Sequence, residues 1–321
     1  MTNHYRPEGY LFGTLENREY VTSRQGLMRA QVEGKILEAT ALLCDSRMRL
    51  HVDLYGIEGI IEKSEAVWCR DSGEVKDIAI ITRVGKPVCF KVLGFAMENG
   101  REVALLSRRE AQKECLLSCL SDLIPGDIVE AKVTHLDSFG AFVDIGCGIV
   151  SLLSIDCISV SRISHPSDRL SVGDRIHVVI KSVDPSNGRI FVTMRELLGT
   201  WQENADTFDV GQTVAGIVRS IEPYGIFIEL SPNLAGLAEL REDSCGAVPV
   251  KVGERVAVYI KSILPDRMKI KLVLIDSYGG SPSPQRLKYF IAPDSVTHID
   301  RWVYSPKNAA KLIESDFTKC I

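Results

Sequence analysis

The feature that most constrains the fold of this chain is an internal repeat. One copy opens at Gly126 and the other at Gly211. Thirteen residues after each opening glycine comes an aromatic–Gly–X–Phe motif, which is Phe139-Gly140-Ala141-Phe142 in the first copy and Tyr224-Gly225-Ile226-Phe227 in the second. A repeat of this kind predicts one small folding unit that the chain builds at least twice.

Each repeat has the pattern of short β-strands. In the first copy, β-rich runs are separated by glycine or polar turns, at residues 128–136, 140–145, 149–153, 175–184 and 189–194. Pro185-Ser186-Asn187-Gly188 predicts a tight hairpin before the last run, because Asn-Gly tolerates the positive φ that such a turn requires. Five short strands with glycine at the bends predict a small closed barrel.

A weaker third copy lies upstream, with Leu50-His51-Val52-Asp53 near the place of the aromatic motif. Met48 and His51 occupy the two aromatic positions. Docking to a protein or to the ribosome is favoured for this copy over base stacking. Two flanking arginines, Arg47 and Arg49, keep stacking open as an alternative.

The repeats predict an all-β chain of tandem five-stranded barrels joined by short helices. Residues 108–120 and 195–205 have a helical composition and supply the links. The Gly-Gly-Ser-Pro-Ser-Pro run at residues 279–284 has a linker composition. The predicted units are an N-terminal arm at 1–25, a degenerate barrel at 26–110, barrels at 122–197 and 208–276, and a small C-terminal element of unassigned fold at 281–321.

Composition limits the function classes. The 321 residues carry a formal net charge of −4, which argues against binding duplex nucleic acid through bulk positive charge. The nine cysteines include no CxxC pair, and no second pair completes the half-site that Cys115 and Cys119 could form, so we predict neither a metal nor a cofactor. The six histidines lie apart from any nucleophile or phosphate loop, so no enzymatic activity is predicted.

Three further observations concern the compartment. An odd number of free thiols indicates a reducing environment. The first residues carry no apolar segment of a secretory signal. No apolar run reaches the roughly 20 residues that a membrane span needs. We therefore expect a cytoplasmic protein without a membrane partner.

The spacing over a whole repeat resembles a known family. Gly126-Asp127-Ile128-Val129, the Phe139 motif through Asp144, Val172-Gly173-Asp174, and Asp184 with Gly188-Arg189 are similar to the S-one RNA-binding motif of ribosomal protein S one. The resemblance covers residues 123–196 and 208–276 well and residues 26–109 weakly. It implies an OB-fold barrel for each repeat. It also implies single-stranded RNA, above all mRNA, as the ligand and the small ribosomal subunit as a partner, as in the short three-repeat S-one-like proteins of bacteria.

The aromatic pairs are the main candidates for RNA contacts. An exposed ring offers its face to an unpaired base, and each stack contributes about 1–3 kcal/mol whatever the base. The alternative is that Phe139, Phe142, Tyr224 and Phe227 are core residues. If Phe139 and Phe142 share one strand, alternation puts them on opposite faces, whereas the resemblance implies that both line the RNA face. That arrangement requires a twist or bulge near Gly140. Recurrence in both repeats favours binding, most strongly for the first aromatic of each pair.

The resemblance also implies a His, an Asp and an Arg on the RNA face. In the middle repeat Asp184 and Arg189 match, and Ser154 stands at the His position. In the last repeat these positions hold Glu239, Leu264 and Lys269, and a carboxylate at Glu239 would repel phosphate. We therefore expect the middle repeat to bind RNA more tightly. Lys132 and Arg195, with Lys181, Arg219 and Lys261, are further candidate phosphate contacts, although each of them is equally well interpreted as ordinary surface charge.

The sequence thus predicts a non-enzymatic binder of single-stranded RNA in translation. Two alternatives remain open. One is a protein-interaction scaffold with reduced RNA affinity, suggested by the missing histidines, the weak first repeat and the acidic balance. The other is an accessory subunit that delivers RNA to an RNA-processing enzyme.

Overall fold

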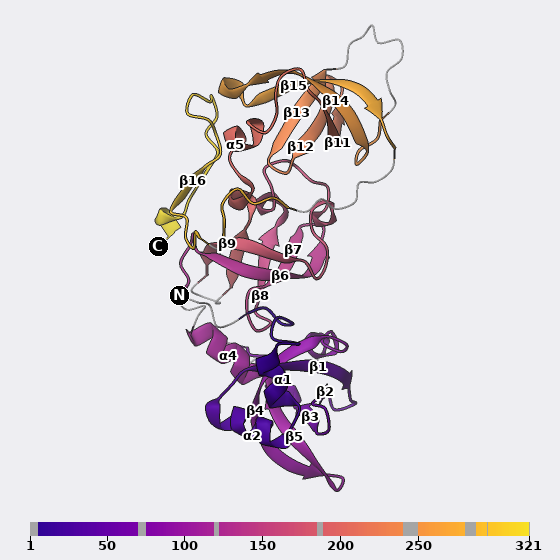
Figure 1. Ribbon diagram of the computed structural model, residues 1–321, viewed down its shortest axis with the longest axis vertical. Helices are drawn as coiled ribbons and strands as arrows, with labels where there is room; N and C mark the ends of the chain where they lie inside the picture. The colour runs from indigo at the N-terminus through magenta and orange to yellow at the C-terminus, as the bar shows by residue number, and fades with distance from the viewer. Residues whose placement is uncertain are drawn as a thin grey trace.

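The computed structural model describes residues 6–69, 75–118, 122–184, 189–239, 250–279, 287–293 and 295–320. Three closed five-stranded barrels follow one another along the long axis of the molecule (Figure 1). The predicted all-β class and the tandem barrels are therefore confirmed. In the described part of the chain, no helix is long and apolar enough to cross a membrane.

The first barrel has the strand order β1-β2-β3-β5-β4. Its strands are β1 (Leu37–Cys44), β2 (Leu50–Asp53), β3 (Glu58–Ile61), β4 (Pro87–Glu98) and β5 (Arg101–Ser107), and the short helix α3 (Asp77–Ile81) precedes β4. The degenerate upstream repeat thus closes into a barrel although it lacks the aromatic motif.

The segment expected to be an N-terminal arm is folded from residue 6 onward. It contains α1 (Leu15–Val21), and α2 (Arg24–Glu33) follows directly. Thr14 and Ser23 cap the two helices, because each side-chain oxygen accepts a hydrogen bond from a first-turn backbone N–H. Leu27 and Ala30 of α2 are buried in the core of the first barrel, so both helices belong to that barrel.

The middle barrel contains the strands that the repeat pattern predicts. They are β6 (Ile128–Asp137), β7 (Gly140–Asp144), β8 (Val150–Ser154), β9 (Arg175–Val183) and β10 (Ile190–Thr193), so no bound differs from the prediction by more than one residue. The barrel closes through the parallel pair β8 and β10. The hairpin predicted at residues 185–188 lies outside the described residues.

The last barrel repeats this arrangement. Its strands are β11 (Thr213–Glu222), β12 (Gly225–Ser231), β13 (Leu234–Glu239), β14 (Arg255–Leu264) and β15 (Lys269–Ser277). Ile263 pairs with Ile270 here, as Val183 pairs with Ile190 in the middle barrel. The register therefore supports the equivalence of Asp184 with Leu264 and of Arg189 with Lys269.

The two links differ from each other. α4 (Arg108–Ser118) is one helix, as expected. The second link, predicted as a helix over residues 195–205, is instead a 3-10 turn (Arg195–Leu198) followed by α5 (Trp201–Ala205). Gly199 separates them at φ 84°, and Thr200 then starts α5 through a capping box with Glu203. A helical composition did not reveal this break.

The C-terminal element runs back along the middle and last barrels. It pairs β16 (Arg301–Val303) with β17 (Glu314–Asp316). His298 bridges to Asp127 at the start of β6, and the Tyr289 hydroxyl accepts a hydrogen bond from the His177 backbone N–H at 3.0 Å. Trp302, with Tyr304 and Phe317, is buried in the hydrophobic cluster of the last barrel. The element therefore connects the two barrels.

Buried polar groups fix the joint between the middle and last barrels. Asn233 is fully buried, and its side chain accepts from the Val160 N–H at 2.9 Å and donates to the carbonyls of Arg195 at 2.8 Å and Gly199 at 2.7 Å. The Tyr304 hydroxyl donates to the Asn233 carbonyl at 2.5 Å. Because the side-chain amide and the backbone carbonyl of Asn233 all have partners across the joint, the joint specifies one arrangement.

Candidate nucleic-acid interface

Phe139 and Phe142 lie on the same outer surface of the middle barrel. Phe139 stands in the turn before β7, where strand alternation does not apply, and it is 50% exposed. Phe142 is half-buried on β7. The two ring centroids are 5.8 Å apart and the rings are nearly perpendicular, at 89°. The alternation conflict in the sequence is thus resolved by where the strand begins.

Gly140 makes this arrangement possible. A Cβ at this position would come within 2.5 Å of the Leu153 carbonyl oxygen on β8. At the equivalent Gly225, a Cβ would lie 2.7 Å from the Ala238 carbonyl oxygen. Glycine therefore lets β7 and β12 close against the neighbouring strand directly beside the first aromatic.

Two further rings extend the surface, and the sequence analysis did not identify either as a site residue. The register places His135, Phe142, Leu152 and Phe191 in one row across β6, β7, β8 and β10. Directly paired residues share a face of the sheet. The His135 ring stacks on Phe142 at 6.0 Å and 27°. We call the surface formed by His135, Phe139, Phe142, Leu152 and Phe191 the ring face. The signal that could have found Phe191 is the β9–β10 register.

Asp184 and Arg189 flank the ring face. The Asp184 backbone N–H donates to the Arg189 carbonyl at 2.8 Å, so the two residues are paired across β9 and β10. Arg189 is exposed and lies two residues before Phe191, on the same side of β10. A cation at this edge can meet a phosphate while the rings meet bases.

The last barrel has a reduced version of this surface. Tyr224 is 61% exposed, and its ring lies perpendicular to Phe227 at 6.1 Å. The remaining row differs, because Ser220 stands in the place of His135 and Lys271 in the place of Phe191. Lys271 pairs with Glu239 at 3.1 Å. Lys269 occupies the position of Arg189, as the sequence predicts.

Comparison with known proteins agrees with this geometry. Residues 122–195, which form the middle barrel, match the S1 RNA binding domain, the domain named S-one above. The chain is 28% identical over 253 residues to the small ribosomal subunit protein bS1 of Leuconostoc lactis. The chain contains an S1 domain and is similar to the S1 proteins of the small ribosomal subunit.

The S1-like chain spans 55% of the Leuconostoc protein, and the match covers 75% of the chain itself. It is also 29% identical over 228 residues to 4-hydroxy-3-methylbut-2-enyl diphosphate reductase of Clostridium acetobutylicum, a match that covers 69% of the chain but only 33% of that enzyme. A solved multidomain protein with nucleic acid binding domains from Streptococcus pneumoniae covers 75% of the chain, and 73% of that protein is covered, at 15% identity and a TM-score of 0.23.

Several basic residues proposed from sequence lie away from the ring face of the S1 domain. Arg195 bonds to Glu196 at 3.2 Å and to the Ser315 hydroxyl at 3.1 Å, which ties it to the C-terminal element. Arg219 is buried in an ion pair with Glu229 at 2.8 Å. Their partners are distant in sequence, apart from Glu196, so composition alone could not distinguish these structural cations from surface charge.

Lys132 is also engaged in a joint. Its ammonium donates to the Glu8 carbonyl at 2.8 Å, where the N-terminal segment crosses the S1 domain. The Lys181 ammonium lies 3.1 Å from the Cys157 sulfur. Lys261 is exposed on the last barrel. None of these three stands in the row of rings.

The equivalent surface of the first barrel is ionic. Its row consists of Leu43, His51, Ile60 and Leu105, without Phe or Tyr. His51 lies 2.6 Å from Glu58, and Arg49 pairs with Asp45, Glu62 and Glu98 at 2.8 to 3.5 Å. Burial would raise the pKa of Asp45, but bonds from Arg49 and His51 hold it well below the usual range. This surface offers carboxylates where the S1 domain offers rings.

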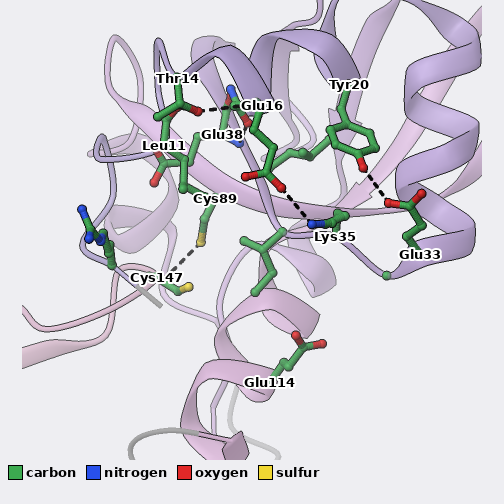
Figure 2. Close-up of a pocket in the computed structure, with 15 residues that line it drawn as sticks. Leu11, Thr14, Glu16, Tyr20, Glu33, Lys35, Glu38, Cys89, Glu114 and Cys147 are labelled. Carbon is green, nitrogen blue, oxygen red and sulfur yellow. Dashed lines mark hydrogen bonds and ion pairs between the residues drawn. The ribbon is translucent and has the colours of Figure 1, made fainter. Parts of the chain in front are cut away.

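A cavity of about 340 Å³ lies beside α1 and α4 (Figure 2). Its ionic groups pair with one another, Tyr20 with Glu33 at 2.6 Å and Lys35 with Glu16 at 2.8 Å. Burial raises the pKa of Glu38 to about 7, although amide groups of Phe12 and Gly9 oppose the shift. Among the described residues, no three His, Cys, Asp or Glu side chains form a metal-binding group. The side chains of Glu16, Glu33, Lys35 and Glu38 in this cavity therefore all have partners within the protein.

Proposed function

We propose that this S1-like chain binds single-stranded RNA, with mRNA as the ligand in translation, through the ring face of its middle barrel. The observation that carries the proposal is the exposed Phe139 ring perpendicular to Phe142, with Phe191 and His135 in the same surface and Arg189 at its edge. Rings of this kind stack on unpaired bases of any sequence. In a duplex, the faces of the bases are stacked on neighbouring base pairs, so protein rings cannot reach them.

The last barrel supplies a second, weaker contact in this proposal. Tyr224 and Phe227 offer one ring pair, whereas the Lys271–Glu239 ion pair replaces the third ring. The small ribosomal subunit is the proposed partner, because the relatives are named as proteins of that subunit. The mode of action is binding, and no catalytic step is proposed.

The first barrel favours a different role, in protein interaction. Its equivalent row is crossed by the Arg49 and His51 ion pairs, and the carboxylates there disfavour phosphate. We propose that this barrel docks the chain to a protein partner. The scaffold alternative thus applies to one barrel of the chain, and RNA binding to the other two.

A filter-binding titration tests the proposed function. The full-length protein is titrated with an unstructured pyrimidine-rich RNA and with a blunt RNA duplex of the same length, each at two salt concentrations. We expect tighter binding of the single strand at both concentrations. Equal affinity for the two RNAs would contradict ring stacking, and no binding to either would contradict the proposed function as a whole.

A further inference from the structure

A second, smaller cavity of about 210 Å³ lies between the first and middle barrels. Arg83 and Lys86 line it from the first barrel, and Lys132 and Thr134 line it from β6. Its volume is that of several water molecules, each of which takes about 30 Å³ in the liquid. We propose that this cavity binds a phosphate group. More specifically, and resting on the proposed function, we propose that this phosphate belongs to the backbone of an RNA strand whose bases lie on the ring face.

The cavity adjoins the ring face. Lys132 pairs with Asp144 in the row beside the His135–Phe142 row, and a bulge between Val133 and His135 separates the two rows. Thr134, which lines the cavity, donates its hydroxyl to the Phe142 carbonyl at 3.0 Å. At about 3.4 Å per residue, Lys132 and His135 are roughly 10 Å apart along β6. A strand of RNA on the rings therefore reaches the cavity within a few nucleotides.

The three cations of the cavity have donors left for a ligand. The Arg83 Nε is buried and has no hydrogen-bond partner among the described residues. Lys86 is exposed, and no ion pair of Lys86 occurs in the described part of the chain. Lys132 uses its ammonium for the Glu8 carbonyl, and an ammonium has three donors. Guanidinium and ammonium groups around one small cavity suit a phosphate oxygen cluster.

Both carboxylates at the cavity already have hydrogen-bond partners. The Glu8 oxygens accept from Arg108 at 2.6 and 3.0 Å and from the Cys89 N–H at 3.1 Å, and an Arg83 terminal nitrogen lies 3.4 Å from Glu8, which leaves the Arg83 Nε open. The Asp144 oxygens accept from backbone N–H groups of Glu8, Gly146 and Gly148 at 2.7 to 3.0 Å. Arg108 offsets the negative charge of Glu8. The three positive charges of Arg83, Lys86 and Lys132 therefore exceed the single negative charge of Asp144.

The larger cavity in Figure 2 provides the contrast. There Lys35 is held by Glu16, and Glu33 is held by the Tyr20 hydroxyl. The smaller cavity combines open space with cation donors that still lack partners. That combination also gives the first barrel a part in RNA binding that its ionic surface does not suggest.

Lys86→Ala in the full-length protein tests the proposal, because Lys86 is exposed and its loss should not affect folding. Lys76→Ala is the matched control: Lys76 is also exposed, lies on the same barrel and does not line the cavity. Lys86→Arg is the conservative variant. Affinity for the single-stranded RNA is measured at several salt concentrations. In a second arm, the thermal midpoint is measured in inorganic phosphate and in chloride at matched ionic strength.

We expect Lys86→Ala to weaken RNA binding by roughly three- to tenfold and to lower the salt slope by about one, with Lys76→Ala unchanged and Lys86→Arg close to wild type. A loss confined to the phosphate arm would assign the site to free phosphate and overturn its RNA form. Equal behaviour of Lys86→Ala and Lys76→Ala in both arms would overturn the proposal entirely. If the wild type binds no RNA, the proposed function fails. The phosphate arm alone then shows whether the cavity binds a phosphate group.

Discussion

At the scale of single residues, base stacking on the ring face requires that Phe139 stands outside the strand that follows it. Phe139, in the β6–β7 turn, lies against the Phe142 ring and is 50% exposed. Phe139→Ala should therefore change the free energy of unfolding by less than about 1 kcal/mol, as surface substitutions do. Urea denaturation of the wild type and the variant measures this change.

The control for that prediction is Phe90→Ala, since Phe90 is fully buried in the first barrel. Removal of a buried Phe costs about 3–5 kcal/mol. If Phe139→Ala were as destabilising as Phe90→Ala, Phe139 would be a core residue and the ring face would lose its most exposed member.

Asp144 gives the chain a pH dependence at the same scale. Burial raises its pKa to about 7, with a further contribution from the Glu8 carboxylate. The folded state thus holds this proton at pH values where the unfolded chain has lost it. The stability that Asp144 contributes is fully present below about pH 4 and is lost as the pH rises to about 7.

We expect the free energy of unfolding to fall between pH 5 and pH 7, by roughly 1–3 kcal/mol from this group. Because ordinary histidines titrate in the same range, the test compares wild type with Asp144→Asn in urea denaturation at pH 5, 6 and 7. The variant should show the smaller decline. An identical decline in both proteins would show that Asp144 is ionised throughout the range.

At the scale of the elements, the middle and last barrels should contribute unequally to RNA binding. The middle barrel has Phe191 and His135 beside its aromatic pair, where the last barrel has Lys271, paired with Glu239, and Ser220. Phe139→Ala should therefore weaken RNA binding more than Tyr224→Ala in the full-length chain. Competition against a labelled single-stranded RNA measures both variants under one condition. A larger loss for Tyr224→Ala would mean that the last barrel is the principal site.

The strands were predictable from sequence because each repeat alternates and turns at glycine or polar residues. Strand alternation alone does not place Phe139, because it cannot show that β7 begins at Gly140. The roles of Arg195 and Lys132 depend on Ser315 and Glu8, residues far away in the chain. Side chains of that kind are assigned only when the tertiary contacts are known.

At the scale of the whole molecule, the barrels are joined by buried polar groups, and Asn233 is the clearest case. Asn233→Ala would leave three backbone groups without partners, those of Val160, Arg195 and Gly199. Each buried unsatisfied group costs about 1–3 kcal/mol. We therefore expect a loss of roughly 3–5 kcal/mol in the free energy of unfolding, with the RNA affinity of the folded protein unchanged.

Asn308→Ala serves as the control, since Asn308 is exposed in the C-terminal element. Thermal unfolding followed by circular dichroism compares both variants with the wild type. A midpoint for Asn233→Ala that equals that of Asn308→Ala would show that the joint is loose.

RNA binding on the ring face is tested most directly by the affinity of folded Phe139→Ala for single-stranded RNA at several salt concentrations. We expect a loss of about 1–3 kcal/mol in binding free energy, the value of one stack, with the salt slope unchanged because no phosphate contact is removed. Arg189→Ala should instead lower the slope by about one. Wild-type affinity in folded Phe139→Ala would contradict the claim that RNA binds on the ring face.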